Sequence, residues 1–424
     1  MEDKDNKNKT KVKSSEIKEE KKEKRRIIRK KKKEETDVIN KTVEFNLLEV
    51  IIIILITGIA VSITSGLIVY NNYDKLFIND NSNSKEELSE FIGIYNEIID
   101  NYVEEVDKKE LIEYAISGMY SYLGDDYSVY LNKDDTETLE ETLEGEYTGI
   151  GVEMVTHYDE EGNPTETLVN RVFSNSPAQE AGLLPGDVLL KVDNEDIVDA
   201  NWVADNVKKG SKDSYEITYS RNGEEKTVTL VKKKVQIDSV SFANYDEVGY
   251  IKIDTFSNVT YSQVVKALDN LDANTKSLVI DLRDNTGGYL QASHNIADLF
   301  IEKDKVVYQL KGRDEIAKEF KTNAGVYKTF DKVVVLINGQ TASASEILTL
   351  ALKENIGAKV VGTKSFGKGT VQDTKILESG SMVKYTSSYW LSPNGNSINK
   401  VGIEPDILVE NPEEQLESAI TAAK

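Results

Sequence analysis

The sequence predicts a mixed α/β protein with a strand-rich middle module and one membrane-spanning helix. Strand and helix patterns alternate after Asp246, which favours an α/β core with substantial parallel pairing. Short strand patterns separated by turn signals fill residues 146–231. The 21 residues from Val50 to Tyr70 include no charged side chain, and about 20 apolar residues span the hydrocarbon core of a bilayer.

Charge is distributed unevenly along the chain. The net charge is −22, yet residues 1–44 carry 17 basic and 11 acidic side chains, a net charge of +6, so the rest of the chain carries −28. We interpret residues 1–44 as a charged cytoplasmic tail without a core, which is either disordered in solvent or in contact with anionic lipid. The acidic remainder gives no support to nucleic-acid binding. With no cysteine, thiolate nucleophiles, disulfides and thiolate metal sites are excluded, and we expect no metal or cofactor.

The membrane anchor is predicted over residues 47–70. The basic run from Arg29 to Lys33 precedes it, and only Lys75 follows closely on the other side. Because basic flanks stay in the cytoplasm, the expected localisation is a single-pass protein of the cell membrane with residues 71–424 on the extracytoplasmic side. The alternative is a cleaved signal peptide, which has a shorter apolar region and a small-residue cleavage site.

Residues 71–85 are predicted to be a polar linker, and residues 86–135 a helical region. Apolar side chains recur there at spacings of three and four, the period of an amphipathic helix. The first run comprises Leu88, Phe91, Ile92, Tyr95, Ile98 and Ile99, and the second comprises Leu111, Tyr114, Ala115 and Met119.

Residues 136–235 form the strand-rich module. Ser176 is predicted to cap a short helix that Pro177 opens and Gly182 ends. The strands are expected at Thr148–Val155, Glu166–Phe173, Asp187–Val192, Tyr215–Ser220 and Lys226–Val231.

The stretch from Ser176 to Leu189, together with an upstream glycine loop, resembles a PDZ domain of the kind found in bacterial proteases. In that family the equivalent loop presents backbone N–H groups to the C-terminal carboxylate of a peptide, which then adds as a strand. Glycine suits a loop that needs positive φ and close backbone approach, although a bulge or turn explains a lone G-x-G pattern equally well. The resemblance assigns peptide binding to Gly149, Ile150, Gly151 and Val152.

Residues 236–424 form the α/β core. Its strands are predicted at Val248–Ile253, Ser277–Leu282, Lys332–Ile337 and Lys359–Gly362, and its helices at Tyr261–Leu271, Leu290–Phe300 and Ser345–Glu354. Three motifs accompany them, at residues 281–288 (DLRDNTGG), 338–346 (NGQTASASE) and 366–372 (FGKGTVQ). With the PDZ-like module and the anchor, these motifs make residues 86–410 resemble the carboxyl-terminal processing peptidases, the tail-specific serine proteases of peptidase family S41.

The resemblance implies a crotonase/ClpP-like α/β peptidase core with an inserted PDZ-like domain, and a Ser–Lys mechanism. Ser343 matches the nucleophile, Lys368 its general base, and Gln372 the residue that orients the lysine. A lysine acts as a base only when neutral, which requires desolvation to lower its pKa. The resemblance implies that the oxyanion hole is formed by the N–H of Ala344 and by the N–H of either Gly287 or Gly288; the sequence does not decide between the two glycines. The implied partners are protein or peptide substrates held by their C-terminal tails, and a second copy of the chain in a homodimer.

Other interpretations compete at the same positions. Residues 343–346 fit a capping box, which explains Ser343 without catalysis, and Lys368 taken alone fits a solvated surface lysine. Residues 362–368 fit G-x-x-x-x-G-K, but neither the magnesium-binding hydroxyl nor a helix follows. A Ser–His–Asp triad would need His294, which is expected to be exposed on a helix.

Two further points qualify the resemblance. A scaffold with a silent core that only recruits protein C-termini is the alternative function. Residues 235–240 lack the proline that is usual in the family before the first core strand, which leaves the joint between the two modules in doubt.

Overall fold

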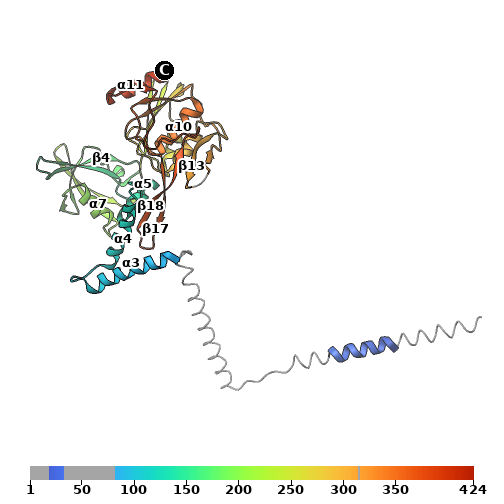
Figure 1. Ribbon diagram of the computed structural model, residues 1–424. Coiled ribbons are helices and arrows are strands. Elements are labelled where there is room, and N and C mark those ends of the chain that lie inside the picture. Colours follow the sequence, from blue (N-terminus) through green and yellow to red (C-terminus); the bar gives the residue numbers. More distant parts are fainter. Residues whose placement is uncertain (1–18, 33–81, 314–315) are drawn as a thin grey trace, which may run out of the picture. The chain divides into compact units, whose positions relative to one another are not determined.

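The computed structural model describes residues 19–32, 82–313 and 316–424 (Figure 1). The chain divides into two compact units, Met1–Val106 and Asp107–Lys424. In the first unit, residues 19–32 and α3 (Ser82–Asn101) are helical. The described helices include none with the length and apolar content needed to cross a bilayer, and the predicted span Val50–Tyr70 lies outside the described residues. Most of the predicted linker also lies outside them, and α3 already begins at Ser82.

The second unit opens with α4 (Lys108–Tyr122), β1 (Val129–Leu131) and α5 (Lys133–Glu144). The Asp107 carboxylate caps α4 by accepting hydrogen bonds from the N–H groups of residues 109 and 110, at 2.8 and 3.0 Å. Asn132 caps α5, and Gly145 ends it with a φ of 72°. The predicted helical region is therefore confirmed for α3 and α4, but it also contains a strand, β1, that helical spacing does not predict.

The strand-rich module is an antiparallel sheet with two helices, α6 (Pro177–Glu180) and α7 (Ala200–Lys208). As predicted, Ser176 caps α6, because its hydroxyl accepts a hydrogen bond from the Gln179 N–H at 3.1 Å. The strand order is β3-β4-β5-β7-β8 with β6 beside β5. The strands are β3 (Val152–Tyr158), β4 (Pro164–Val172), β5 (Val188–Val192), β6 (Glu195–Asp196), β7 (Ser214–Arg221) and β8 (Glu224–Val231).

One predicted strand of this module is wrong. Thr148–Val155 is two strands, because the chain breaks at residues 150–151, where Gly151 has a φ of 88°. The first, β2 (Glu146–Gly149), pairs with β9 (Lys233–Gln236), and only the second belongs to the module's own sheet. The break leaves a loop between the two sheets.

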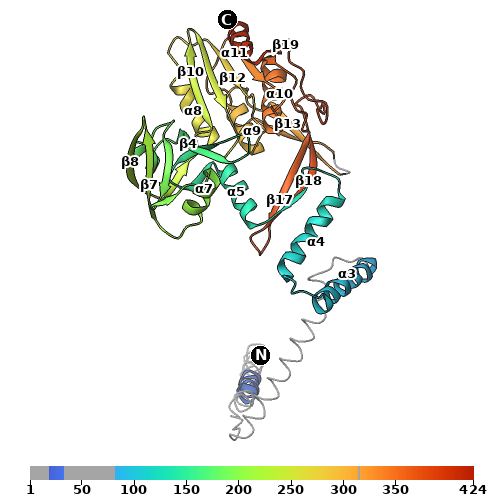
Figure 2. The same ribbon diagram turned by 90° about the vertical axis from the view of Figure 1, so that its left-hand side faces the viewer.

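The core is a six-stranded sheet of order β10-β11-β12-β15-β16-β19 (Figure 2). All neighbours are parallel except β10 and β11, so the predicted parallel α/β core is confirmed. Its strands are β10 (Val240–Tyr245), β11 (Val248–Ile253), β12 (Ser277–Asp281), β15 (Lys332–Ile337), β16 (Lys359–Gly362) and β19 (Ile407–Leu408). Its helices are α8 (Thr260–Asp269), α9 (Leu290–Asp298), α10 (Ala344–Ile356) and α11 (Pro412–Ala423).

Strand β15 shows how both faces of this sheet are covered. Side chains alternate along a strand, so Val335 and Ile337 join the core cluster that includes α8, α9 and α10. Val334 and Leu336 point to the other face, in a cluster with the alanines of α11. A strand buried on both faces is a continuous apolar run, as here.

A second sheet joins the start of the unit to its end. Strand β18 (Met382–Leu391) pairs with β17 (Thr370–Ile376), with β13 (Val306–Gly312), and with β1 through Leu131 opposite Met382; β14 (Lys318–Lys321) lies beyond β13. Figure 2 shows the β17–β18 hairpin extending away from the core sheet. The residues before β1 are thereby held beside the segment that follows Lys368.

Candidate active site

A cavity of about 550 Å³ opens between the loop after β12, the start of α10, helix α5 and the β17–β18 hairpin. It brings together three of the predicted catalytic residues, although they come from separate parts of the chain. The polar side of its lining comprises Glu140, Thr286, Gly288, Tyr289, Ser343, Lys368, Thr370, Gln372, Thr374 and Lys384, and the apolar side comprises Leu139, Leu143, Leu290, Val371, Ile376 and Met382.

Ser343 lies in a strained turn between β15 and α10. Its φ of 56° and ψ of −117° are unusual for a residue with a side chain, and such strain concentrates at functional sites. Its N–H donates to Glu346 Oε2 at 2.9 Å. The capping-box interpretation is therefore confirmed for the Glu346 half, and it does not compete with the presence of Ser343 in the cavity.

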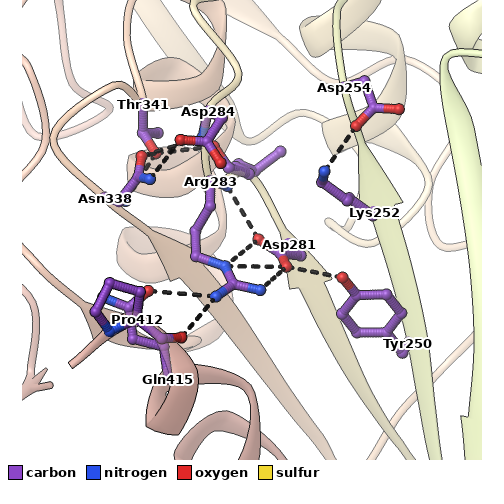
Figure 3. Close-up of polar contacts among 11 residues, drawn as sticks. Tyr250, Lys252, Asp254, Asp281, Arg283, Asp284, Asn338, Thr341, Pro412 and Gln415 are labelled. Carbon is purple, nitrogen blue, oxygen red and sulfur yellow. Dashed lines mark hydrogen bonds and ion pairs between the residues drawn. The ribbon is translucent and has the colours of Figure 1, made fainter. Parts of the chain in front are cut away.

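Two loops are joined beneath this turn. The carbonyl oxygen of Asn285 accepts hydrogen bonds from the Ala342 N–H at 3.1 Å and from the Ser345 hydroxyl at 2.9 Å. The Asp284 N–H donates to Asn338 Oδ1 at 3.0 Å, and Asn338 Nδ2 donates back to Asp284 Oδ1 at 2.8 Å (Figure 3). Residues 284–288 and 338–345 therefore behave as one rigid surface.

The two candidate glycines differ in what their amides do. The Gly287 N–H donates to Asn285 Oδ1 at 2.9 Å, whereas the Gly288 N–H has no acceptor among the described residues and Gly288 lines the cavity. The Ala344 N–H, in the first turn of α10, also has no acceptor within the described part of the chain. Side chains are excluded at both glycines, since a Cβ on Gly287 would lie 2.9 Å from the Ser343 Cβ, and one on Gly288 would lie 2.0 Å from the Phe256 oxygen.

A buried ion pair anchors the glycine loop to the sheet. Asp281, at the end of β12, is fully buried and receives Arg283 Nε at 3.0 Å and Arg283 Nη2 at 2.7 Å. The Tyr250 hydroxyl donates to the same carboxylate at 2.8 Å, and burial, followed by the Asp281 charge, raises the pKa of this phenol. Figure 3 shows Arg283 reaching on to the side chain of Gln415 and the carbonyl of Pro412 in α11.

Glu346 connects the nucleophile turn to the lysine loop. Its fully buried carboxylate accepts hydrogen bonds from the Ser365 hydroxyl at 2.6 Å and from the N–H groups of Gly367 at 2.7 Å, Lys368 at 2.9 Å and Ser343 at 2.9 Å. Burial raises the pKa of this carboxyl, and the four bonds oppose the rise. The sequence pattern assigned Glu346 to a cap alone, because nothing in it shows that a second loop 20 residues downstream folds onto the same carboxylate.

The Lys368 side chain has few polar contacts. Its backbone carbonyl accepts a hydrogen bond from Trp390 Nε1 at 2.8 Å, but its ammonium makes no hydrogen bond or ion pair with any described residue, including Ser343. The ammonium lies over the ring of Tyr127, whose centroid is 4.5 Å from Nζ. Lys368 and Ser343 thus line one cavity without a hydrogen bond between their side chains among the described contacts.

The surroundings of Lys368 favour its neutral form. Burial lowers the pKa of its ammonium, and the positive charge of Lys384 lowers it further. The acidic Asp125 and Glu346 act in the opposite direction without reversing the shift. The prediction that a base here needs desolvation therefore agrees with the direction of the pKa.

Gln372 lies in the cavity but does not contact the lysine. Its amide nitrogen donates to the hydroxyls of Thr370 at 3.0 Å and Thr386 at 3.1 Å. Val371 lines the cavity and supplies apolar surface there, whereas Phe366 is 53% exposed and takes no part in the lining.

Two competing interpretations are wrong. His294 was expected to be exposed but is only 4% exposed, because its face of α9 packs on the core against the ring of Tyr308. It lies outside the cavity lining and cannot serve a triad with Ser343. Lys368 is followed by strand β17 and not by a helix, so the phosphate-loop pattern is not a nucleotide site.

The predicted peptide-binding loop lines a second cavity, of about 170 Å³, in the strand-rich module. Gly149, Ile150 and Val152 form one wall, and Val203 and Val207 of α7 the other. Gly151 packs so closely on Ser176 that an added Cβ would lie 2.1 Å from the serine Cβ. The four loop residues are therefore brought together beside an apolar pocket.

Comparison with known proteins agrees with this architecture. Residues 247–409 match the model of peptidase family S41, residues 148–231 that of the PDZ domain, and residues 71–136 that of the activating protease CtpB N-terminal domain. A probable CtpA-like serine protease of Staphylococcus haemolyticus is 32% identical over 388 residues, which cover 91% of this chain and 76% of the relative. The chain belongs to peptidase family S41.

Further similarities follow the same lines. A probable CtpA-like serine protease of Staphylococcus aureus strain COL is 33% identical over 375 residues, covering 88% of this chain and 74% of the relative. The photosystem II D1 C-terminal processing protease has a TM-score of 0.45 and 25% identity, covering 78% of this chain and 96% of that chain. The family and sequence matches confirm the predicted family, the carboxyl-terminal processing peptidases of family S41, and the predicted enzyme class, a serine peptidase.

The family match does not contain the whole site. In this S41 serine peptidase the residues from Asp125 to Leu131, which reach Lys368 and β18, precede the matched range 247–409. They lie instead in the range of the CtpB N-terminal domain. The surroundings of the Lys368 side chain are therefore drawn from two separately recognised parts of the chain.

Proposed function

We propose that this S41 peptidase is a membrane-anchored endopeptidase that uses Ser343 and Lys368 to cleave extracytoplasmic proteins near their C-termini. The observation that carries the proposal is the shared cavity, which is lined by a strained serine, a lysine of lowered pKa and Gly288. Neither the lysine ammonium nor the Gly288 N–H has a hydrogen-bond partner among the residues that the structure describes. Catalytic hydrogen bonds commonly shorten only when substrate is bound, so the missing Ser343–Lys368 contact is compatible with this role.

The acylation step uses only groups of the chain. Neutral Lys368 accepts the hydroxyl proton of Ser343, Oγ bonds to the substrate carbonyl carbon, and the carbonyl electron pair moves to oxygen. The N–H groups of Gly288 and Ala344 have no competing acceptor in the described part of the chain and are the proposed donors to that oxyanion. The Lys368 ammonium then returns its proton to the leaving amine, and water completes hydrolysis of the ester.

The PDZ-like domain is proposed to recognise the substrate tail. Amides of Ile150, Gly151 and Val152 would receive the terminal carboxylate, and the pocket beside Val203 and Val207 would receive an apolar last side chain. Tail capture predicts that a peptide with a free carboxylate binds more tightly than the same peptide ending in an amide. The Ser343→Ala variant allows this binding to be measured without cleavage.

Cleavage of an unstructured protein with an apolar C-terminus tests the central claim. The wild-type chain should cut it, and both Ser343→Ala and Lys368→Arg should lose about three orders of magnitude or more of the rate, because arginine stays protonated. Lys375→Arg, exposed on β17, is the matched control. Cleavage that survives Lys368→Arg would rule out this base. Wild-type binding without cleavage, unchanged by Ser343→Ala, would favour the scaffold alternative.

Membrane topology is tested by labelling, because the chain has no cysteine of its own. A cysteine at Asn222, in an exposed turn of the PDZ-like domain, should react with an impermeant maleimide on intact cells. A cysteine at Ser14 should react only after lysis. The reverse pattern would contradict the proposed orientation. Sedimentation of the purified chain tests the homodimer expected from the family.

A further inference from the structure

The Lys368 ammonium lies over an aromatic ring that belongs to neither the peptidase match nor the predicted catalytic set. The Tyr127 ring centroid is 4.5 Å from Nζ, within the range in which an ammonium is attracted to the face of a tyrosine. Because no described residue forms a hydrogen bond or ion pair with this ammonium, the ring is its closest defined partner.

The turn that carries Tyr127 is firmly held. The Asp125 carboxylate accepts the Tyr127 N–H at 3.2 Å and the Ser128 hydroxyl at 2.6 Å. The Ser128 hydroxyl oxygen in turn accepts the N–H of Thr386 in β18 at 2.9 Å. Strand β1 then pairs along β18 from Val129 to Leu131, so the ring is fixed relative to the hairpin that follows Lys368.

Charged groups face Lys368 from three elements. Lys384 lies on β18, Glu346 on α10, and Asp125 in the turn with Tyr127. The carboxylate of Glu346 is already occupied by four hydrogen bonds, and Asp125 by those of its own turn. Among the described residues, the Tyr127 ring therefore remains as a defined contact for the charge that Lys368 gains during catalysis.

We propose that Tyr127 is a positioning residue for Lys368, whose π face keeps the amine in the cavity and stabilises the ammonium formed as Ser343 attacks. The inference rests on the proposed Ser–Lys function. It also means that the N-terminal region contributes to the active site, so a fragment limited to residues 247–409 would lack part of the environment of its base.

The pH profile of kcat/KM distinguishes this role from a structural one. With Tyr127→Leu, the free amine keeps an apolar cover but its ammonium loses the ring, so the midpoint of the acidic limb should move to lower pH. The plateau at high pH should fall by roughly 2- to 30-fold, because there the ammonium exists only in the transition state. At low pH, where Lys368 is charged throughout, the variant should match or exceed the wild type.

The experiment uses the full chain and a quenched fluorescent peptide with an apolar C-terminal tail. Tyr127→Phe should lose less than Tyr127→Leu, and Tyr114→Leu, on an exposed face of α4, is the control for the same chemical change. Should Tyr127→Leu unfold, increasingly fluorinated phenylalanines at position 127 weaken the π face at nearly constant shape, and the plateau should fall in step with fluorination.

The outcomes separate the two proposals. Activity retained by Lys368→Arg would remove the proposed base and this inference with it. An inactive Lys368→Arg combined with a Tyr127→Leu profile that overlays the wild type would overturn the role of Tyr127 alone. A uniform loss at every pH, with an unmoved midpoint, would also overturn it, since that is the behaviour of a structural residue.

Discussion

The two sides of the catalytic cavity are built differently. The nucleophile side, residues 281–288 and 338–346, is bound by short hydrogen bonds at Asp281, Asn285, Asn338 and Glu346, each with defined partners. On the base side, the Lys368 ammonium has no such bond among the described residues and lies over a single ring. The difference lies in the side chains: polar contacts fix those of the first side, whereas burial and surrounding charge act on the Lys368 ammonium, whose loop backbone is itself hydrogen-bonded to Glu346.

The difference follows from what each side must do. An oxyanion hole requires donors at fixed positions, and preorganised dipoles cost no reorganisation during the reaction. A lysine base must be neutral in one step and charged in the next, and a strong hydrogen bond to a carboxylate would hold it in the charged form. Sparse contacts at Lys368 are therefore the physical condition for its proposed chemistry.

Glu346→Ala removes a carboxylate that is hydrogen-bonded to both the Ser343 turn and the Lys368 loop, and we expect the largest effect from it. The variant leaves the N–H groups of Ser343, Gly367 and Lys368 buried without an acceptor, at about 1–3 kcal/mol each, so the loss of stability should be about 4 kcal/mol. Urea unfolding can be followed by Trp390 in a Trp202→Phe background, since the chain has two tryptophans. Glu417→Ala, exposed on α11, is the control; equal midpoints would show that the two sides hold together without Glu346.

Arg283→Met tests the nucleophile side alone. It leaves the fully buried Asp281 charge without its bidentate partner, and we expect a loss of about 3 kcal/mol, reduced from the value for fully buried pairs because the Arg283 side chain is 19% exposed. The same unfolding assay measures it, with Lys400→Met as an exposed control. A stability change below about 1 kcal/mol would show that the glycine loop does not depend on this pair.

Much of the core followed from the sequence because its signals are local. The continuous apolar run Lys332–Ile337 is β15 at the predicted bounds, and Lys359–Gly362 is β16. The prediction of one strand over Thr148–Val155 was wrong because the alternation of apolar and polar residues continues across Gly151, where the positive φ redirects the chain. The prediction that His294 is exposed was wrong because the sequence does not show which neighbouring element will cover a polar side chain on a helix.

For the candidate site too, residues within local motifs could be predicted, and contacts that depend on the folded chain could not. Ser343, Lys368 and Gly288 could be named because motifs identify residue types at set spacings. The choice of Gly288 over Gly287 required the Asn285 contact, which exists only once the loop is folded. The partnership of Tyr127 with Lys368, across 241 positions of the sequence, depends on the pairing of β1 with β18 and has no local signal.

Thr386→Val probes the base side, where we expect a smaller effect. The change removes one of the two described acceptors of the Gln372 amide nitrogen, at 3.1 Å, and a hydrogen bond to Asp125, and the expected loss of stability is about 1 kcal/mol in the Trp390 assay. Val371→Thr, on the neighbouring strand β17, is the reverse exchange between two side chains of nearly equal size. It serves as the control for exchanging a methyl group and a hydroxyl in this hairpin. A loss as large as that of Glu346→Ala would contradict the picture of a base side held mainly by burial.

Lys384→Met should have the smallest effect and the most specific one. The Lys384 charge lowers the pKa of Lys368, so its removal should raise that pKa, and the acidic limb of kcat/KM should move to higher pH by a fraction of a unit. The plateau should not fall, because a more basic amine accepts the Ser343 proton at least as well. Lys375→Met, exposed on β17 and outside the cavity lining, removes a charge from the same hairpin and should leave the profile in place.

Added salt should shrink the difference between Lys384→Met and wild type, because screening weakens a partly exposed charge pair. If the acidic limb of the Lys384→Met profile moved to lower pH, as expected for Tyr127→Leu, the electrostatic account of Lys368 would be wrong.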